Sequence, residues 1–404
     1  MKPLAGIRII DLSMGWAGPL ACRHLADLGA DVIKVESCVR FDWWRSWEAT
    51  PQWIEDDGAE KSTSFNMVNR NKRTITLELD QSEGRDLLLG LVKQAHAVVE
   101  NFSGGVLSKL ELDYRALNAA NPQIVLLSMP PFGSSGPWAE FRAYGSTVEH
   151  ASGLPHLNGQ PQDLPVMQHV ALGDPIGGIT GAQALLTALR HQSRTGQGQR
   201  IDLSQTEALF PLASHGILEY SATGQEPDRS RGRSTSSFHQ GVYPCQGDDA
   251  WVIIELRDPS EWETLAKVLR LPGGLNPADQ GTNLTAIDAA ISEQTSVKEA
   301  GPLVTALQDH GIAAARTFSY RDLLEDPHLA ARNFWQWKDR AVVGLQPNPS
   351  APYRFGDEPL PVETPAPTLG QHNAEVLGEL LGLTPEDLKA LEANGIIGTR
   401  PKLK

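Results

Sequence analysis

The chain has 404 residues, a formal net charge of −14, 40% hydrophobic residues and 21% charged residues, the composition of a globular protein rather than a disordered or fibrous one. This acidic balance argues against extended nucleic-acid binding, and no stretch reaches the roughly 18 uncharged apolar residues that a membrane span needs. The N-terminus lacks the pattern of a secretory signal, so we expect a cytoplasmic protein. Three widely spaced cysteines, Cys22, Cys38 and Cys245, predict reduced thiols and no metal site.

The first forty residues predict a β-α-β unit. Residues 6–12 and 31–36 are typical of buried strands, and residues 19–28 between them of a helix. So short a crossover makes the two strands parallel neighbours in an open α/β sheet. The turn at 13–19 is rich in glycine but is not the G-x-G-x-x-G of dinucleotide folds, which disfavours a nicotinamide cofactor.

Two segments that follow carry aromatic and basic residues. Residues 38–66 contain four tryptophans together with Arg40 and Arg45, which can stack on a purine and bind its phosphates, or can pack a long loop onto the domain. Arg70, Lys72 and Arg73 precede a predicted strand. They suggest an anionic ligand, although basic residues at the edges of strands also discourage aggregation.

Strands and helices then alternate. The predicted elements are a strand at 74–79, a helix at 82–94, a strand at 97–100, a helix at 106–118 and a strand at 123–129. This alternation predicts a doubly wound α/β domain. Ligands bind beyond the carboxyl ends of the strands in such sheets, so the turn that begins with Asn101 and Phe102 is a candidate wall of the site.

The stretch from 169 to 204 holds the best candidate for chemistry, Asp174. In Gly173-Asp174-Pro175 the aspartate is typical of a helix N-cap, which requires no catalysis. Three glycines on the following helix leave one face bare, for a packed neighbour or for a ligand: Gly177, Gly178 and Gly181. Gly196 is the expected left-handed cap, and residues 199–203 alternate like a strand.

A long helix at 206–219 precedes a change of composition. The polar residues 221–237 are typical of a linker, and His239 beside it is more typical of a solvated loop histidine than of a catalytic one. The helices predicted at 373–381 and 384–394 return to the first domain. We therefore expect a large α/β domain at 1–220, a small α+β domain at 221–325, and a return to the large domain at 326–404.

Five fragments in fixed order resemble the family III CoA-transferases (CaiB/BaiF family), and the formyl-CoA transferases among them. They are LAGIRIIDLSMGWAGPLACRHLADLGADVIKVE, NRNKRTITLEL, AVVENFSGGVLSKLELDYRALNAANPQIVLLSM, LGDPIGGITGAQALLTALRHQSRTGQGQRIDLS and APTLGQHNAEVLGELLGL. Together they span nearly the whole chain. The resemblance implies a Rossmann-like large domain, a smaller α+β domain and an interlocked homodimer.

The resemblance also implies a function: moving CoA between carboxylic acids, an EC 2.8.3-type activity, through an aspartyl-CoA thioester on Asp174. A carboxylate suits this chemistry because it can be nucleophile and leaving group in turn. The implied ligands are an acyl-CoA and a carboxylic acid as substrates, with no permanently bound cofactor and no metal. Neither nucleic acid nor a membrane is an expected partner.

Site residues carry over where the sequence matches the family. The resemblance places Gly15, Trp16 and Ala17 at the thioester end of CoA, and Arg40, Lys72, Arg73, Asn101 and Phe102 at its nucleotide and phosphates. Arg142 falls where relatives hold a lysine. Residues implied at the substrate pocket are Trp47, Tyr144, Glu149 and His239.

Departures from the family pattern narrow the function. Trp16 and Gly145 replace a glutamine and a glutamate of the oxalate-using branch, and that branch's glycine-rich lid is missing between 221 and 242. Oxalate is therefore not expected, and the indole favours a bulkier or more apolar acyl group. Two alternatives remain open. An α-methylacyl-CoA racemase-like enzyme is disfavoured because residues 134–137 hold no histidine, and a non-catalytic CoA-binding subunit of a hetero-oligomer is disfavoured by the presence of Asp174.

Overall fold

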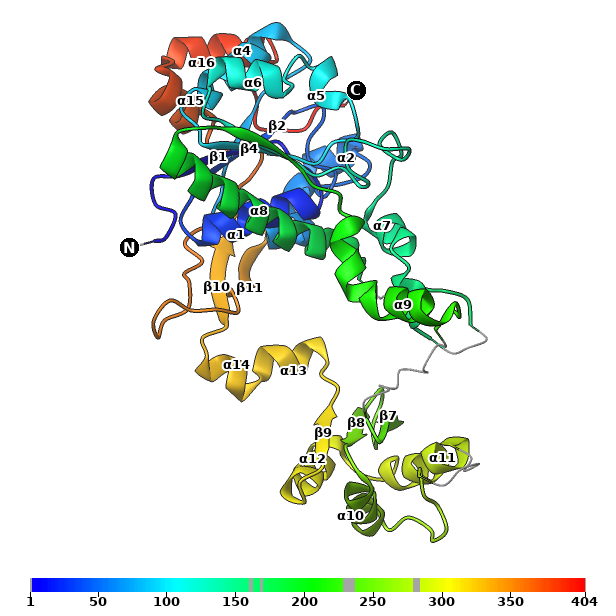
Figure 1. Cartoon of the computed structure of the whole chain (residues 1–404). Coiled ribbons are helices and arrows are strands. Elements are labelled where there is room, and N and C mark those ends of the chain that lie inside the picture. Colours follow the sequence, from blue (N-terminus) through cyan, green and yellow to red (C-terminus); the bar gives the residue numbers. More distant parts are fainter. Residues whose placement is uncertain (1, 160–162, 168–169, 228–236, 279–283, 404) are drawn as a thin grey trace. The chain divides into compact units, whose positions relative to one another are not determined.

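The computed structural model describes residues 2–159, 163–167, 170–227, 237–278 and 284–403. The chain divides into two compact units, shown in Figure 1. The large unit comprises residues 1–154, 167–214 and 328–404, and the small unit comprises 155–166 and 215–327. Residues 228–236 of the expected linker lie outside the described residues, and residues 221–223 belong to a helix. The boundaries expected at 220 and 325 stay predictions.

A six-stranded parallel sheet forms the centre of the large unit. Its strands are β1 (Arg8–Asp11), β2 (Asp31–Glu36), β3 (Arg73–Thr76), β4 (Ala97–Glu100), β5 (Val125–Ser128) and β6 (Gln199–Asp202), in the order β3-β2-β1-β4-β5-β6. The chain adds strands on one side of β1 and then continues from β4 on the other. The crevice between the carboxyl ends of β1 and β4 is therefore the topological switch point, where open α/β sheets bind ligands. The predicted α/β fold class is confirmed.

Helices cover both faces of this sheet (Figure 1). One layer contains α1 (Ala17–Asp27) and α8 (Gly173–Thr195), and the other contains α4 (Ser82–Val92), α6 (Tyr114–Ala120), α15 (Asn373–Leu381) and α16 (Pro385–Ala393). Shorter helices lie in the loops: α2 (Pro51–Glu55), η1 (Gly58–Glu60), α3 (Thr63–Val68), α5 (Val106–Lys109), α7 (Gly145–Ala151) and η3 (Glu207–Leu209). No helix in the described ranges is long and apolar enough to cross a membrane.

Each face of the sheet has its own apolar core because side chains alternate along every strand. Ile9 packs with α1 and α8, whereas its neighbour Ile10 packs with α4, α15 and α16. A Cβ at Gly178 would lie 2.8 Å from the Ala17 carbonyl oxygen, and one at Gly181 would lie 2.9 Å from Met129 Cε. These two glycines therefore let α8 approach α1 and β5 closely.

The C-terminal part of the chain completes the large unit. Val376 and Leu377 of α15 and Leu391 of α16 belong to the core that contains Ile10. A hairpin that the sequence analysis did not predict, β10 (Trp335–Arg340) and β11 (Gly344–Pro349), precedes them.

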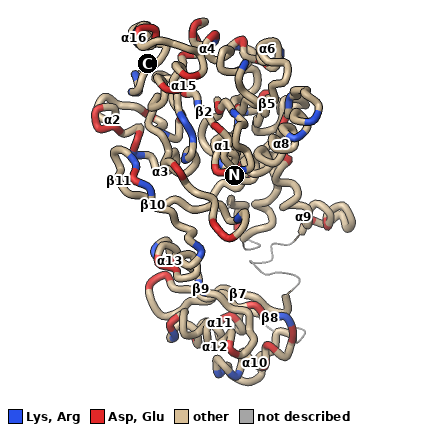
Figure 2. The backbone as a smooth tube through the Cα atoms, turned by 90° about the vertical axis from the view of Figure 1, so that its left-hand side faces the viewer, with Lys and Arg blue, Asp and Glu red and all other residues tan. Residues whose placement is uncertain are grey.

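The small unit is an α+β structure. Its antiparallel sheet has the order β7 (His239–Pro244), β8 (Trp251–Leu256) and β9 (Ala313–Arg316). Its helices include α10 (Pro259–Leu269), α11 (Leu284–Thr295), α12 (Ala300–Asp309) and α13 (Tyr320–Glu325). Three further helices contain residues assigned to both units: η2 (Leu154–Leu157), α9 (Phe210–Thr223) and α14 (Pro327–Ala331). Acidic and basic residues are interspersed within each unit (Figure 2).

One predicted helix is wrong in its extent. The segment predicted as a single helix at 106–118 is divided into α5 and α6. Glu111 adopts φ 57°, outside the helical region, and the Asp113 side chain accepts a hydrogen bond from the Ala116 N–H, which caps a new helix. Apolar residues keep a helical spacing on both sides of the break, so the sequence pattern predicted one continuous helix.

Candidate active site

Buried polar groups hold the turn after β1 in place. Lys34 Nζ donates to the Ser13 carbonyl oxygen at 2.7 Å and pairs with Asp42 Oδ2 at 2.8 Å. The other Asp42 oxygen accepts the Gly15 N–H at 2.8 Å. Gly15 has φ 73°, and a Cβ there would lie 2.0 Å from the Trp43 ring, so no other residue fits this turn without rearrangement.

Asn101, at the end of β4, clamps the same turn from the other side of the switch point. Its Oδ1 accepts the Met14 N–H and its Nδ2 donates to the Met14 carbonyl oxygen, both at 2.8 Å. Both polar atoms of this predicted CoA-binding residue are therefore engaged with backbone. Asn101 positions the turn that leads to Trp16 and Ala17.

Asp174 lies at the start of α8 and faces this turn. The predicted N-cap assignment is wrong: Leu172 is the N-cap residue, and Asp174 lies within the first turn of the helix. The backbone N–H groups of Ala17 and Gly145, from two other segments, lie near its carboxylate and favour its charged form. These two groups belong to the first residues of α1 and α7. The carboxylate thus joins three helix starts.

Burial raises the pKa of the Asp174 carboxyl to about 6, because desolvation disfavours its charged form more than the Ala17 and Gly145 N–H groups favour it. No ion pair to Asp174 occurs among the described residues. The group is therefore largely ionised at neutral pH and more basic than an ordinary aspartate.

Gly145 leaves the space that the carboxylate occupies. A Cβ at position 145 would lie 2.0 Å from Asp174 Oδ2 and 2.7 Å from its Cγ. Contacts this short do not occur, so any side chain here would displace the carboxylate or α7. Gly145 stands where the oxalate-using branch has a glutamate. Its lack of a side chain therefore allows the Asp174 carboxylate to lie where it does.

Asp174 opens into a pocket of about 400 Å³, within the usual range for a small-molecule site. We call it the Asp174 pocket. It is lined by Met14, Trp43, Asn101, Phe102, Ser103, Pro131, Arg142, Ala143, Tyr144, Gly145, Thr147, Val148, Asp174 and Gln205. Arg142 is its single cationic lining residue and makes no ion pair within the described part of the chain. It is available to an anionic ligand.

Aromatic rings form one wall of the Asp174 pocket. The ring of Trp43 stacks on that of Trp47 with centroids 4.4 Å apart, and Tyr144 meets both rings edge-on at 5.5 Å. Trp47 and Tyr144 are more than half exposed. Trp16 instead packs against Trp44 at 5.3 Å. The tryptophan segment therefore both packs the loop and borders the pocket.

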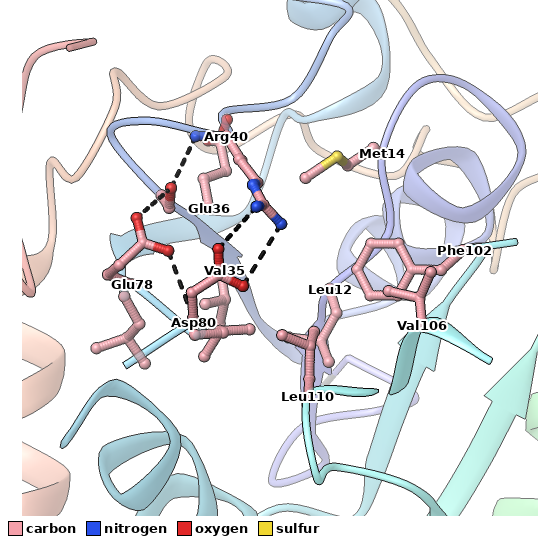
Figure 3. Close-up of a pocket in the computed structure, with 13 residues that line it drawn as sticks. Leu12, Met14, Val35, Glu36, Arg40, Glu78, Asp80, Phe102, Val106 and Leu110 are labelled. Carbon is pink, nitrogen blue, oxygen red and sulfur yellow. Dashed lines mark hydrogen bonds and ion pairs between the residues drawn. The ribbon is translucent and has the colours of Figure 1, made fainter. Parts of the chain in front are cut away.

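A second pocket, of about 100 Å³, lies beyond the ends of β1, β2 and β3 (Figure 3). We call it the Arg40 pocket. Its lining residues are Leu12, Met14, Val35, Glu36, Ser37, Arg40, Leu77, Glu78, Leu79, Asp80, Phe102, Val106 and Leu110. Arg40 pairs with Asp80 at 2.8 Å, and Met14 and Phe102 line both pockets. Leu77–Asp80 were not predicted as site residues because the predicted strand at 74–79 included residues 77–79, whereas β3 ends at Thr76.

Lys72 and Arg73 line neither of these pockets. Lys72 is fully buried, and its Nζ binds Asp11 Oδ2 and Asn69 Oδ1 at 2.8 Å each. Arg73 begins β3, at the amino end of the sheet, where it pairs with Asp31. The charges of Lys72 and Arg73 therefore neutralise carboxylates of the protein itself. The structure does not bring either residue together with Asp174.

Glu149 is buried in α7 and binds the backbone just before Asp174. Its Oε2 accepts the N–H of Leu172, the N-cap residue of α8, at 2.8 Å. It does not line the Asp174 pocket. Glu149 therefore ties α7 to the start of α8, and so helps to fix Asp174 relative to Gly145.

His239 is not the solvated loop residue that the sequence suggested. It lies in β7 of the small unit and is 3% exposed. Its Nε2 is 2.8 Å from Tyr243 Oη, which donates to Asp288 Oδ1 at 3.0 Å. Within the small unit the ring is thus part of a buried polar cluster.

Comparison with known proteins agrees with this geometry. Residues 4–373 match the family model described as CoA-transferase family III. The chain is 32% identical to a succinate–glutarate CoA-transferase of Agrobacterium fabrum, over 94% of this chain and 96% of that protein. It is 29% identical to a succinyl-CoA–D-citramalate CoA-transferase of Chloroflexus aurantiacus, over 98% of each. A CaiB/BaiF family protein from Brucella suis, of known crystal structure, aligns with TM-score 0.83 and 32% identity, over 94% of this chain and 99% of that one.

The chain therefore belongs to CoA-transferase family III, the CaiB/BaiF family. The predicted family is confirmed.

Replacing Gly145 with alanine tests the steric constraint on Asp174. We expect Gly145→Ala to lower the free energy of unfolding by about 1–3 kcal/mol, because the new methyl group must displace the carboxylate or α7. Gly301→Ala in α12 is the matched control, since a Cβ there meets nothing within 4 Å. Thermal melts measure both. A Gly145→Ala protein as stable as wild type, with the carboxylate unmoved in a crystal structure, would contradict the constraint.

Proposed function

We propose that this chain is an acyl-CoA:carboxylate CoA-transferase, of the EC 2.8.3 type, with Asp174 as its nucleophile. One observation supports this most directly. The Asp174 carboxylate opens into a pocket, has the Ala17 and Gly145 N–H groups near it, has no cationic partner among the described residues, and has a pKa raised to about 6. A fixed, desolvated carboxylate that is ionised at neutral pH is the chemical requirement for attack on a thioester.

The proposed reaction exchanges acyl groups without net proton transfer or redox change. An oxygen of Asp174 attacks the thioester carbonyl carbon, the C–S bond breaks, and CoA leaves as a thiolate. The thiolate then attacks the aspartyl carbonyl of the mixed anhydride, which releases the first acid and leaves an aspartyl-CoA thioester. The incoming carboxylate attacks this thioester, and the returning thiolate cleaves the second anhydride to give the new acyl-CoA and free Asp174.

The two N–H groups on Asp174 have a role in each step. While Asp174 is ionised, the nearby Ala17 and Gly145 N–H groups favour its negative charge. When its carbonyl carbon is attacked, negative charge develops on an aspartyl oxygen, and donors already fixed in place stabilise that charge. Gly145, with no side chain, lets the carboxylate reach this position.

The proposed path for CoA runs from the Arg40 pocket to the Asp174 pocket. Met14 and Phe102 line both, and the apolar side chains around Phe102 suit the adenine ring (Figure 3). Arg40 and Arg142 are the cations proposed for the phosphates. We omit Lys72 and Arg73 from this role because they line neither pocket, whereas Arg40, although paired with Asp80, has a side chain that is 58% exposed. The relatives named above act on short dicarboxylic acids, so such acids and their CoA thioesters form the first panel to test.

Covalent trapping tests the nucleophile. Mixing the protein with acyl-CoAs and then hydroxylamine should modify the peptide that contains Asp174, as judged by peptide mass spectrometry. Asp174→Ala should lose this modification and at least about 10³-fold of the exchange rate, because no other carboxylate of the pocket lining replaces it. Asp86→Ala, an exposed position on α4, is the control and should behave as wild type. Absence of any adduct with a protein that binds CoA would reject the nucleophile.

The pH dependence of the first step follows from the raised pKa. Only the ionised carboxylate attacks, so the single-turnover rate should be nearly constant above pH 7. It should fall through pH 6, to about one tenth at pH 5. Rapid quenching followed by mass spectrometry of the Asp174 adduct measures it, with circular dichroism at each pH to verify the fold. A rate independent of pH between 5 and 8 would contradict a nucleophile that titrates near 6.

We also propose that the functional form is a cytoplasmic homodimer. Helix α9 carries apolar side chains that are at least half exposed in the single chain: Leu212, Ile217, Leu218 and Tyr220. So dense an apolar surface is typical of an interface.

The mass in solution tests this assignment. Light scattering should give twice the chain mass of 43.9 kDa for wild type. It should show dissociation for Leu218→Glu, because a buried unpaired charge is costly at an interface. Val297→Glu, an equally exposed apolar position in the small unit, is the control. A wild-type protein that remains monomeric at micromolar concentration would contradict the dimer.

A further inference from the structure

Gln205 is a buried polar residue of the Asp174 pocket that neither the family resemblance nor the proposed chemistry uses. It follows β6, is 6% exposed and lines the pocket with Asp174. Its Nε2 donates to the Met129 carbonyl oxygen at 2.7 Å, which fixes the orientation of the amide. Its Oε1 accepts no hydrogen bond within the described part of the chain. Because Gln205 lines the pocket and this oxygen has no protein donor there, the oxygen is open to a donor group of a ligand.

The amide lies against the helix turn that carries Asp174. A Cβ at Gly177 would lie 3.1 Å from Gln205 Cγ and 3.3 Å from Gln205 Oε1. Gly177 is three residues after Asp174 in α8, and residues at this spacing are neighbours on a helix surface. Gly177 therefore gives the Gln205 amide its place beside the turn from which the carboxylate projects.

Gln205 and the nucleotide end of the proposed CoA path lie beyond different strands of the sheet. The Arg40 pocket lies beyond β1, β2 and β3, whereas Gln205 follows β6, at the opposite edge of the sheet. Strands lie about 4.8 Å apart, so β6 is roughly 14 Å from β1. With CoA entering from the β2 and β3 side, the part of a thioester that faces Gln205 is the acyl group.

We propose that Gln205 is a specificity residue: its Oε1 accepts a hydrogen bond from a hydroxyl group of the acyl substrate, so that the enzyme prefers hydroxy acids and their CoA thioesters. This inference rests on the proposed function of Asp174. An ionised carboxylate on the substrate is an acceptor only and cannot satisfy Oε1, whereas a hydroxyl is a donor. A site built to bind a substrate hydroxyl discriminates strongly against the analogue that lacks it, because its own polar group is then left unpaired.

The test compares pairs of acyl-CoAs that differ by one hydroxyl group. The probes are 3-hydroxybutyryl-CoA against butyryl-CoA, and malyl-CoA against succinyl-CoA. The readout is the rate of CoA transfer to the Asp174 peptide without an acceptor acid. We expect wild type to react at least about tenfold faster with the hydroxylated member of one pair, and Gln205→Met to reduce that ratio to within about threefold. Because both members are measured on the same protein, loss of active enzyme cancels from the ratio.

Gln192→Met is the matched control. Gln192 is a buried glutamine of α8 whose Nε2 also donates to backbone carbonyl oxygens, those of His96 and Gln123, and it lies outside the pocket. Its variant should keep the wild-type ratio. Equal wild-type rates within both pairs, or a preference that survives in Gln205→Met, would overturn the proposal. So would an equal loss of affinity for free CoA and for all thioesters in Gln205→Met, which would assign Oε1 to the pantetheine amide. Failure of the proposed function is distinct, since wild type would then form no adduct with any probe.

Discussion

The turn after β1 depends on one buried ammonium group. Lys34 is fully buried, and burial opposes its charge, but Asp42, Asp11 and Glu36 more than offset that effect and raise its pKa above the ordinary range. It thereby remains a cation that holds the Ser13 carbonyl oxygen and orients Asp42 toward Gly15. Removing one member of such a network leaves an uncompensated buried charge, which costs several kcal/mol. The position of the Ala17 N–H, and hence of Asp174, follows from this network.

Two buried carboxylates near this turn have opposite environments. Burial raises the pKa of Asp11 by itself, but the adjacent Lys72 and Lys34 outweigh it, so the pKa of Asp11 lies below its usual value. Asp174 has only neutral N–H donors, so burial prevails and its pKa rises. The buried cations thus lie beside Asp11, and Asp174 is left without a cationic partner among the described residues. Residue type alone does not distinguish the two, since both are aspartates that adjoin a glycine-rich turn.

Much of the order of strands and helices could be predicted from the local pattern of apolar and polar residues. The bounds of β2 and β4 were predicted to the residue because both strands are short segments rich in valine or isoleucine. Asp174 was selected from its place at the start of a glycine-containing helix; its expected N-cap role is wrong, and its catalytic role stays a prediction. Sequence does not show which cation meets which carboxylate across the chain, so Lys72 and Arg73 were assigned to a ligand. For the same reason Gln205 was missed: its significance lies in its contacts with Met129 and Gly177, residues 76 and 28 positions away.

The division of the two cores along the chain has a consequence for biosynthesis. The core residues of the small unit lie between Tyr243 and Ile312, so all of them leave the ribosome within one continuous segment. The core that contains Ile10 also needs Val376, Leu391 and Ile397. Helices α4 and α6 can cover part of this face early, but the part covered by α15 and α16 stays exposed until translation is nearly complete. The large unit can close only after synthesis is nearly complete, and during that interval its exposed apolar face is a natural substrate for chaperones.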